Sequence, residues 1–225
     1  MSDSADISSA KGIAYLEGLK EFFIAGLSFR EALCGAPQVE KYSFSRFLLH
    51  LLPLLYQKAL GLPACNKDVG LPEEEEETDI LLPEFVSEEE YTMIENSLER
   101  LFGNDDYFLE AHGEEMQFTD APITSRLSEY LTDIYQPVSN LILTAKSRDY
   151  IALPYAVLRC RKYFEEHWGD CLLAAMRVLH SILFNSSQED DIEEEHVALH
   201  ENEEPIEALL QARIDEFMKG LENGD

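Results

Sequence analysis

Apolar residues recur at the spacing of an α-helix along most of this chain. Positions three or four apart are apolar over long stretches, and glycine, proline or short polar turns separate one stretch from the next. Turn-bounded alternation of apolar and polar residues, the pattern of a strand, is missing almost everywhere. We therefore predict an all-α protein with a six-helix core, orthogonal or bundle-like. The six segments are residues 9–34, 43–60, 87–102, 124–146, 150–167 and 170–184.

Local signals predict where several of these helices lie and end. Residues 43–60 are apolar almost all round the helix, which is typical of a central helix. Ser87 followed by Glu90 forms a capping box, so a helix is expected to open at Ser87. Gly169 is expected to end the fifth helix and Asp170 to cap the sixth, which predicts a helix–helix corner between them.

The composition changes after residue 184. Residues 185–204 are rich in acidic and poor in apolar side chains, which predicts an acidic linker after a helical domain of residues 1–184. Residues 205–225 are then expected to form an amphipathic helix with a narrow apolar stripe over 205–221. Because a lone helix of this length is marginal in water, the stripe must pack in a groove. Docking on its own core, and pairing with a second copy or a different protein, both remain open.

Charge narrows the classes of partner. The chain of 225 residues has 17 Lys and Arg against 45 Asp and Glu, a formal net charge of −28. Such a charge repels phosphates, so we expect no binding to nucleic acid or to an anionic membrane surface. The most apolar run, Phe47–Tyr56, is far shorter than the roughly 20 residues of a membrane span. The N-terminus has no secretory pattern, and the four cysteines have no zinc-template spacing, so we expect free thiols in the cytoplasm.

The segment from Arg159 to Cys171 is the first candidate for a functional site. It contains the only tryptophan, Trp168, and lies in the one net-positive stretch of the chain. An anionic ligand could be held there, with Arg161 as a forked donor. The alternative is that the arginines pair with neighbouring acids while Trp168 packs the corner.

Signals for catalysis or for a cofactor are weak. His167 and Cys171 are four residues apart, a spacing that could activate a thiolate, but the helix break expected at Gly169 separates them. The Glu193-x-x-His196 pair lies in the acidic linker, where a solvated charge run is expected. Phosphate-loop, nucleophile-elbow and metalloprotease motifs are missing from the sequence. We predict no catalytic residue, no metal site and no cofactor, and the missing motifs argue against an enzyme.

Two sequence boxes resemble a known family. One runs from residue 122 to residue 135 and ends in Asp133-Ile134-Tyr135; the other is Phe164-Glu165-Glu166-His167-Trp168-Gly169, with Arg161 before it. Together they resemble the bacterial domain-of-unknown-function family 5063. The resemblance implies a helical domain of bacterial source and no assigned activity.

The resemblance also suggests which residues meet. Asp133 and Tyr135 on the fourth helix are expected to face the fifth, where an Asp133–Arg161 pair would be a structural lock or the floor of a site. The candidate ligand-binding residues are therefore Asp133, Tyr135, Arg161, Glu165, His167 and Trp168.

The biochemical function is not specified by these patterns. The first hypothesis is a cytoplasmic helical protein-interaction module with an acidic surface, which engages a protein partner or itself through residues 205–221. The alternative is a small-ligand or anion-binding protein with its site at the corner from Arg161 to His167.

Overall fold

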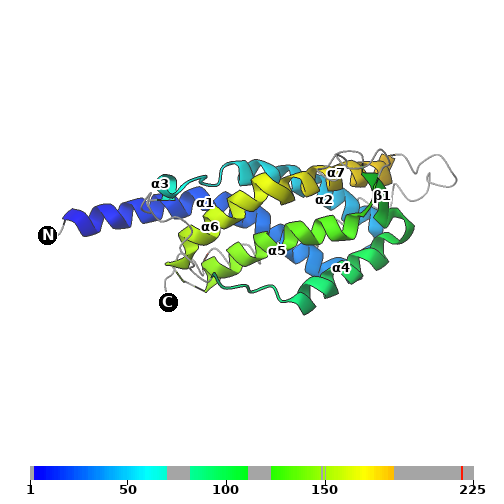
Figure 1. Cartoon of the computed structure of the whole chain (residues 1–225), viewed down its shortest axis with the longest axis horizontal. Coiled ribbons are helices and arrows are strands. Elements are labelled where there is room, and N and C mark those ends of the chain that lie inside the picture. Colours follow the sequence, from blue (N-terminus) through cyan, green and yellow to red (C-terminus); the bar gives the residue numbers. More distant parts are fainter. Residues whose placement is uncertain are drawn as a thin grey trace.

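The predicted all-α architecture is confirmed. The computed structural model describes residues 3–69, 82–110, 123–147, 149, 151–184 and 219 (Figure 1). The predicted acidic linker and C-terminal helix, residues 185–225, lie outside the described residues except for Lys219. The helices are α1 (Asp3–Gly35), α2 (Lys41–Leu60), α3 (Asn66–Val69), α4 (Glu88–Phe102), α5 (Leu127–Lys146), α6 (Ala152–Tyr163) and α7 (Gly169–Phe184), with 3₁₀ turns η1 (Ala36–Gln38) and η2 (Gly103–Asp106), the π-helical turn η4 (Phe164–Trp168) and strands β1 (Tyr107–Glu110) and β2 (Ile123–Arg126).

Helix α5 occupies the centre of the bundle. It packs against α1, α4, α6 and α7, whereas α2 packs chiefly against α1 and α7 (Figure 1). The apolar residues of α5, such as Leu131 and Ile134, are fully buried, but Leu54 and Leu60 of α2 are more than half exposed. The prediction that residues 43–60 form the central helix is therefore wrong. Helix α2 has apolar side chains on all its faces, but some of these side chains are exposed to solvent.

Side chains from outside the helices cap their first turns. Ser87 Oγ accepts from the amide of Glu90 at 3.1 Å, which confirms the predicted start of α4. Helix α2 is capped by the Glu40 carboxylate, which accepts from the amides of Tyr42 and Ser43, each at 2.9 Å. Each cap satisfies amide groups that have no partner within the helix.

A short hairpin joins α4 to α5, although the sequence analysis predicted no strands. Strands β1 and β2 pair antiparallel, with Tyr107 opposite Arg126 and Glu110 opposite Ile123. Each strand has four residues, too few to show a clear alternation. The buried Glu110 carboxylate accepts from the guanidinium of Arg177 at 3.1 Å, so the hairpin is tied to α7.

The helix break predicted at Gly169 does not form. Helix α6, the π-helical turn η4 and α7 follow one another without a gap, and Gly169 has helical dihedral angles, φ −63° and ψ −42°. Its amide donates to the carbonyl oxygen of Phe164, five residues earlier, which is the bond of a π-helix. The backbone therefore widens at this point instead of ending, and Asp170 is a helical residue and not a cap.

Among the described residues, no helix combines the length and the apolar character needed to cross a bilayer.

Candidate functional site

Asp133 and His167 lie against each other on the surface of the bundle. Asp133 comes from α5 and His167 from the π-helical turn η4, and Asp133 Oδ2 is 3.2 Å from His167 Nε2. The Asp133 side chain is 24% exposed and the His167 side chain 54% exposed. The structure thus brings together one residue from each of the two sequence boxes.

Cys171 of α7 completes this cluster. Its Sγ lies 3.7 Å from the same Nε2 atom of His167, and its side chain is buried. Because the helix continues through Gly169, residues four apart share a face. One donor atom each from Asp133, His167 and Cys171 lies within 4.8 Å of the other two.

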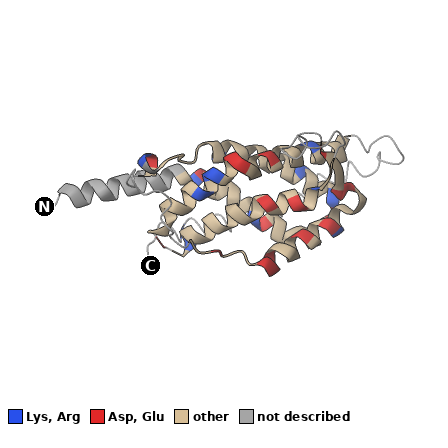
Figure 2. Ribbon diagram, in the orientation of Figure 1, with Lys and Arg blue, Asp and Glu red and all other residues tan. Residues whose placement is uncertain are grey.

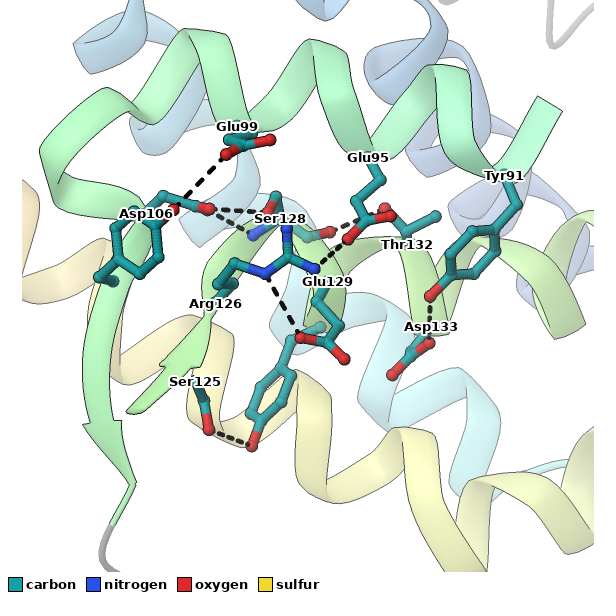
Figure 3. Close-up of polar contacts among 12 residues, drawn as sticks. Tyr91, Glu95, Glu99, Asp106, Ser125, Arg126, Ser128, Glu129, Thr132 and Asp133 are labelled. Atoms are coloured by element: carbon teal, nitrogen blue, oxygen red, sulfur yellow. Dashed lines mark hydrogen bonds and ion pairs between the residues drawn. The ribbon is translucent and has the colours of Figure 1, made fainter. Parts of the chain in front are cut away.

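Tyr91 of α4 holds the Asp133 carboxylate from the other side. The Tyr91 hydroxyl donates to Asp133 Oδ1 at 2.6 Å (Figure 3). Burial and the charge of Asp133 raise the pKa of Tyr91, so the phenol keeps its proton and remains a donor. One carboxylate oxygen is therefore held by Tyr91, while the other faces His167.

The electrostatic field at the cluster is negative. Burial raises the pKa of the Cys171 thiol to about 12, and the charges of Asp133, Asp170 and Glu129 act in the same direction. Acidic positions line α4 and α5 in this region (Figure 2). The nearby guanidinium of Arg126 is already paired with Glu95 and lies 3.6 Å from Glu129 (Figure 3). The cluster consequently favours a cation over an anion.

The sequence of the second box explains how His167 reaches this place. A Cβ at position 169 would lie 2.5 Å from the carbonyl oxygen of Phe164, so only glycine fits the π-helical turn. The rings of Phe164 and Trp168 pack with centroids 4.7 Å apart. Trp168 is fully buried and its Nε1 donates to the carbonyl of Cys160 at 3.1 Å. Trp168 therefore anchors the turn that carries His167.

Arg161 lies apart from Asp133. Its Nε donates to Glu165 at 2.7 Å and one terminal nitrogen donates to the carbonyl of Ala59, at the end of α2, at 2.8 Å. The Asp133–Arg161 pair expected from the resemblance does not form, because the partners of Asp133 are Tyr91 and His167. Arg161 acts at the α2 terminus, with its donors directed to Glu165 and the backbone.

Tyr135 also points elsewhere. Its hydroxyl donates to Glu90 at 2.6 Å and lies 3.5 Å from the sulfur of Cys34 in α1. The six residues that the sequence suggested therefore divide between several places. Asp133 and His167 meet, whereas Tyr135, Arg161, Glu165 and Trp168 make other contacts.

Two residues of the cluster were missed by the sequence analysis. Cys171 carried a signal, its four-residue spacing from His167, which was set aside because a helix break was expected between them. Tyr91 carried no signal, since it is one of several polar or amphipathic positions on α4 and only the docking of α4 onto α5 selects it.

The arrangement is not that of a nucleophilic triad. In a triad the nucleophile and the carboxylate bind opposite nitrogens of the imidazole. One nitrogen takes the proton of the nucleophile while the carboxylate holds the N–H of the other. Here Asp133 Oδ2 and Cys171 Sγ both face His167 Nε2. The donor atoms converge on one point, as they do around a bound ion.

Comparison with known proteins assigns the fold family. The sequence profile described as "Domain of unknown function (DUF5063)" matches residues 15–185. The chain belongs to this family. The resemblance inferred from the two sequence boxes is confirmed, and no activity comes with it. No curated protein matches the chain.

A solved structure supports the fold of this DUF5063 member. The crystal structure of protein BF1032 from Bacteroides fragilis is similar over 78% of this chain and 96% of that chain, with a TM-score of 0.61 and 24% sequence identity. At this identity the likeness concerns the fold alone. The two boxes of the family resemblance supply Asp133 and His167, which meet at the site.

Proposed function

We propose that this DUF5063 protein is a helical cation-binding protein whose site is formed by Tyr91, Asp133, His167 and Cys171. The observation that carries the proposal is that one donor atom each from Asp133, His167 and Cys171 lies within 4.8 Å of the other two. The second carboxylate oxygen of Asp133 accepts a hydrogen bond from Tyr91. The acidic surroundings favour a positively charged occupant.

Binding of a cation fits the described residues better than two alternatives. An anion site at Arg161 is disfavoured because its donors are directed to Glu165 and to the carbonyl of Ala59. Thiol catalysis is disfavoured because the Cys171 thiol, with its pKa raised to about 12, supplies little thiolate at neutral pH. Binding of a cation requires neither free donors on Arg161 nor a reactive thiolate at Cys171.

We place the protein in the cytoplasm of a bacterium. All four cysteines are free thiols, and a site that includes Cys171 works only where thiols stay reduced. The high negative charge of the chain also keeps it away from nucleic acid and anionic membrane surfaces.

Thermal stability in the presence of cations tests this proposal. The unfolding temperature is measured with magnesium, calcium, zinc and spermidine, and with phosphate as an anion. At least one cation should stabilise the wild type, because a ligand of the folded state raises its stability. Asp133→Asn should lose the effect, whereas Asp105→Asn, which removes an equal charge from an exposed position paired with Lys41, should keep it. The proposal is contradicted if only phosphate raises the unfolding temperature, or if no cation raises it in a manner that depends on Asp133.

A second function, association with protein, is supported by the apolar stripe over 205–221. The described residues also expose large apolar side chains on which such a stripe can pack, among them Leu54, Ile151 and Leu173. We propose that residues 205–221 dock on the chain itself or on a partner. Deletion of residues 186–225 should change the oligomeric state or lower the solubility, as measured by light scattering. A deletion variant that matches the full chain in both contradicts this second proposal.

A further inference from the structure

The distances within the cluster match the coordination of a metal ion. In a tetrahedral zinc site, bonds of about 2.0–2.1 Å to nitrogen and oxygen and about 2.3 Å to sulfur separate an oxygen from a nitrogen by about 3.3 Å and a nitrogen from a sulfur by about 3.6 Å. The corresponding separations are 3.2 Å between Asp133 Oδ2 and His167 Nε2, and 3.7 Å between His167 Nε2 and Cys171 Sγ. Two of the three separations therefore match the edges of a coordination tetrahedron, and the third, between Asp133 and Cys171, is within 4.8 Å.

A hydrogen bond accounts for only one of the two contacts of His167 Nε2. His167 Nε2 has either one proton or one lone pair, so it forms one good hydrogen bond, yet it faces both Asp133 Oδ2 and Cys171 Sγ. A metal ion at the centre would use the nitrogen lone pair, the carboxylate oxygen and the sulfur together. Coordination would thus engage all three atoms, whereas one hydrogen bond engages only two.

On these grounds we propose that the cation is a borderline-soft divalent metal ion of the zinc class, bound by Asp133 Oδ2, His167 Nε2 and Cys171 Sγ. This inference rests on the proposed cation-binding function and names its ligand. The donor set decides the class, since magnesium and calcium select oxygen ligands whereas imidazole and thiolate select zinc and its neighbours.

The surroundings have the features of a metal site beyond its ligands. Tyr91 donates to Asp133 Oδ1, the oxygen that points away from the metal position, as the outer partners of ligating carboxylates do. The His167 side chain is more than half exposed, so an ion can reach the site from solvent. Three protein ligands leave the fourth position of a tetrahedron to water or to a donor from another molecule.

Binding at Cys171 requires a proton to leave. The sulfur–hydrogen bond breaks, the proton passes to solvent, and the sulfur–metal bond forms without any change of oxidation state. The charge of the ion offsets the burial and the neighbouring carboxylates that otherwise keep the thiol protonated.

Cobalt(II) is the probe, because a thiolate bound to cobalt gives a charge-transfer absorption band that reports the Cys171 ligand. The full chain is reduced, freed of metal and titrated with cobalt(II), and then with zinc in competition. The variants are Cys171→Ser, Asp133→Asn and Tyr91→Phe, and the controls are Cys65→Ser and Asp105→Asn, both at exposed positions. Circular dichroism and thermal unfolding of each variant without metal show that it is folded.

The proposal expects a thiolate band that zinc abolishes. The band should be lost in Cys171→Ser. The affinity for cobalt should fall at least about tenfold in Asp133→Asn. It should fall about tenfold in Tyr91→Phe, because this variant loses the hydrogen bond that orients the Asp133 carboxylate. Cys65→Ser and Asp105→Asn should bind as the wild type does. A band that survives Cys171→Ser, or its absence from the wild type, overturns the inference.

The two proposals fail separately. If magnesium or spermidine stabilises the protein in a manner that depends on Asp133 while cobalt gives no band from Cys171, the metal inference falls and the cation-binding function stands. If no cation at all has an effect that depends on Asp133, both fall.

Discussion

The amide of Gly169 donates to the carbonyl oxygen of Phe164, five residues earlier in the same continuous helix. This bond widens one turn, the π-helix η4, and that turn carries His167 to Asp133 of α5. Single π-helical turns inside α-helices occur frequently at functional sites. The packing of one glycine against a backbone carbonyl is thus linked to the geometry of the candidate site.

Gly169→Ala should destabilise the protein. The new Cβ would lie 2.5 Å from the Phe164 carbonyl oxygen and 3.1 Å from the Phe164 ring, so the turn must shift. Overpacking of this kind costs about 1–3 kcal/mol, which chemical denaturation measures. The same shift should move His167 and weaken any cation effect that depends on Asp133.

Gly35→Ala is the matched control. Position 35 has helical dihedral angles, and nothing lies within 4 Å of a Cβ placed there. Alanine should therefore leave stability unchanged or raise it by about 0.5–1 kcal/mol, because it has less freedom to lose on folding. Equal effects at positions 35 and 169 would contradict the steric argument.

Removal of the Asp106 carboxylate should loosen the start of α5. Asp106 is fully buried, and its two oxygens accept from the amide of Ser128 at 2.7 Å and from the Ser128 hydroxyl at 2.8 Å (Figure 3). Asp106→Ala leaves both donors buried without their acceptor, at a cost of about 1–3 kcal/mol.

The neighbouring Asp105 provides the comparison. Its side chain is 44% exposed and pairs with Lys41 at 2.6 Å. Exposed ion pairs contribute about 0–1 kcal/mol, so Asp105→Ala should change the unfolding free energy little. If the two alanine variants unfold at the same denaturant concentration, the capping role of Asp106 is wrong.

The sequence predicts the helices of this protein well because their apolar periodicity is strong and local. It misjudges Gly169, since glycine commonly ends helices, and the close approach that requires glycine here depends on the backbone position of Phe164. The error has a consequence for the site. A continuous helix places His167 and Cys171 on one face, and the expected break removed that pair from consideration.

Other features depend on how the elements pack. The hairpin consists of two four-residue strands whose pairing partners lie far apart in the chain. Tyr91 becomes a partner of Asp133 only through the docking of α4 on α5. Likewise, apolar content alone does not show that α5 is central while α2 exposes Leu54. Tertiary relations of this kind are not encoded in one segment.

The four thiols should separate into two classes of reactivity. Cys34 and Cys65 are exposed, whereas Cys160 and Cys171 are buried and burial raises the pKa of each of these two to about 12. Because the thiolate is the reactive form, the buried pair should react slowly with Ellman's reagent in mildly alkaline buffer. Two thiols should react quickly in the native protein and all four in concentrated guanidinium chloride. A third fast thiol would contradict the burial of Cys160 or Cys171.

Arg161→Met should destabilise the fold without altering cation binding. The Arg161 side chain is 14% exposed, and its guanidinium donates to the carbonyl of the fully buried Ala59 and to Glu165. Methionine retains much of the apolar stem but leaves the end of α2 without this donor. The Ala59 carbonyl still accepts from the amide of Leu62 at 3.1 Å, so the variant loses one hydrogen bond from a charged donor, at a cost of about 1.5–3 kcal/mol. Denaturation with and without the stabilising cation measures both quantities.

Arg159→Met separates this effect from a simple loss of positive charge. The Arg159 side chain is 43% exposed and pairs with Glu84, which is 64% exposed, so its contribution should be about 0–1 kcal/mol. A variant at position 161 that unfolds like the wild type would show that Arg161 does not fasten α2. Loss of the cation response in Arg161→Met alone would instead place Arg161 in the binding site, against the partners that the structure gives it.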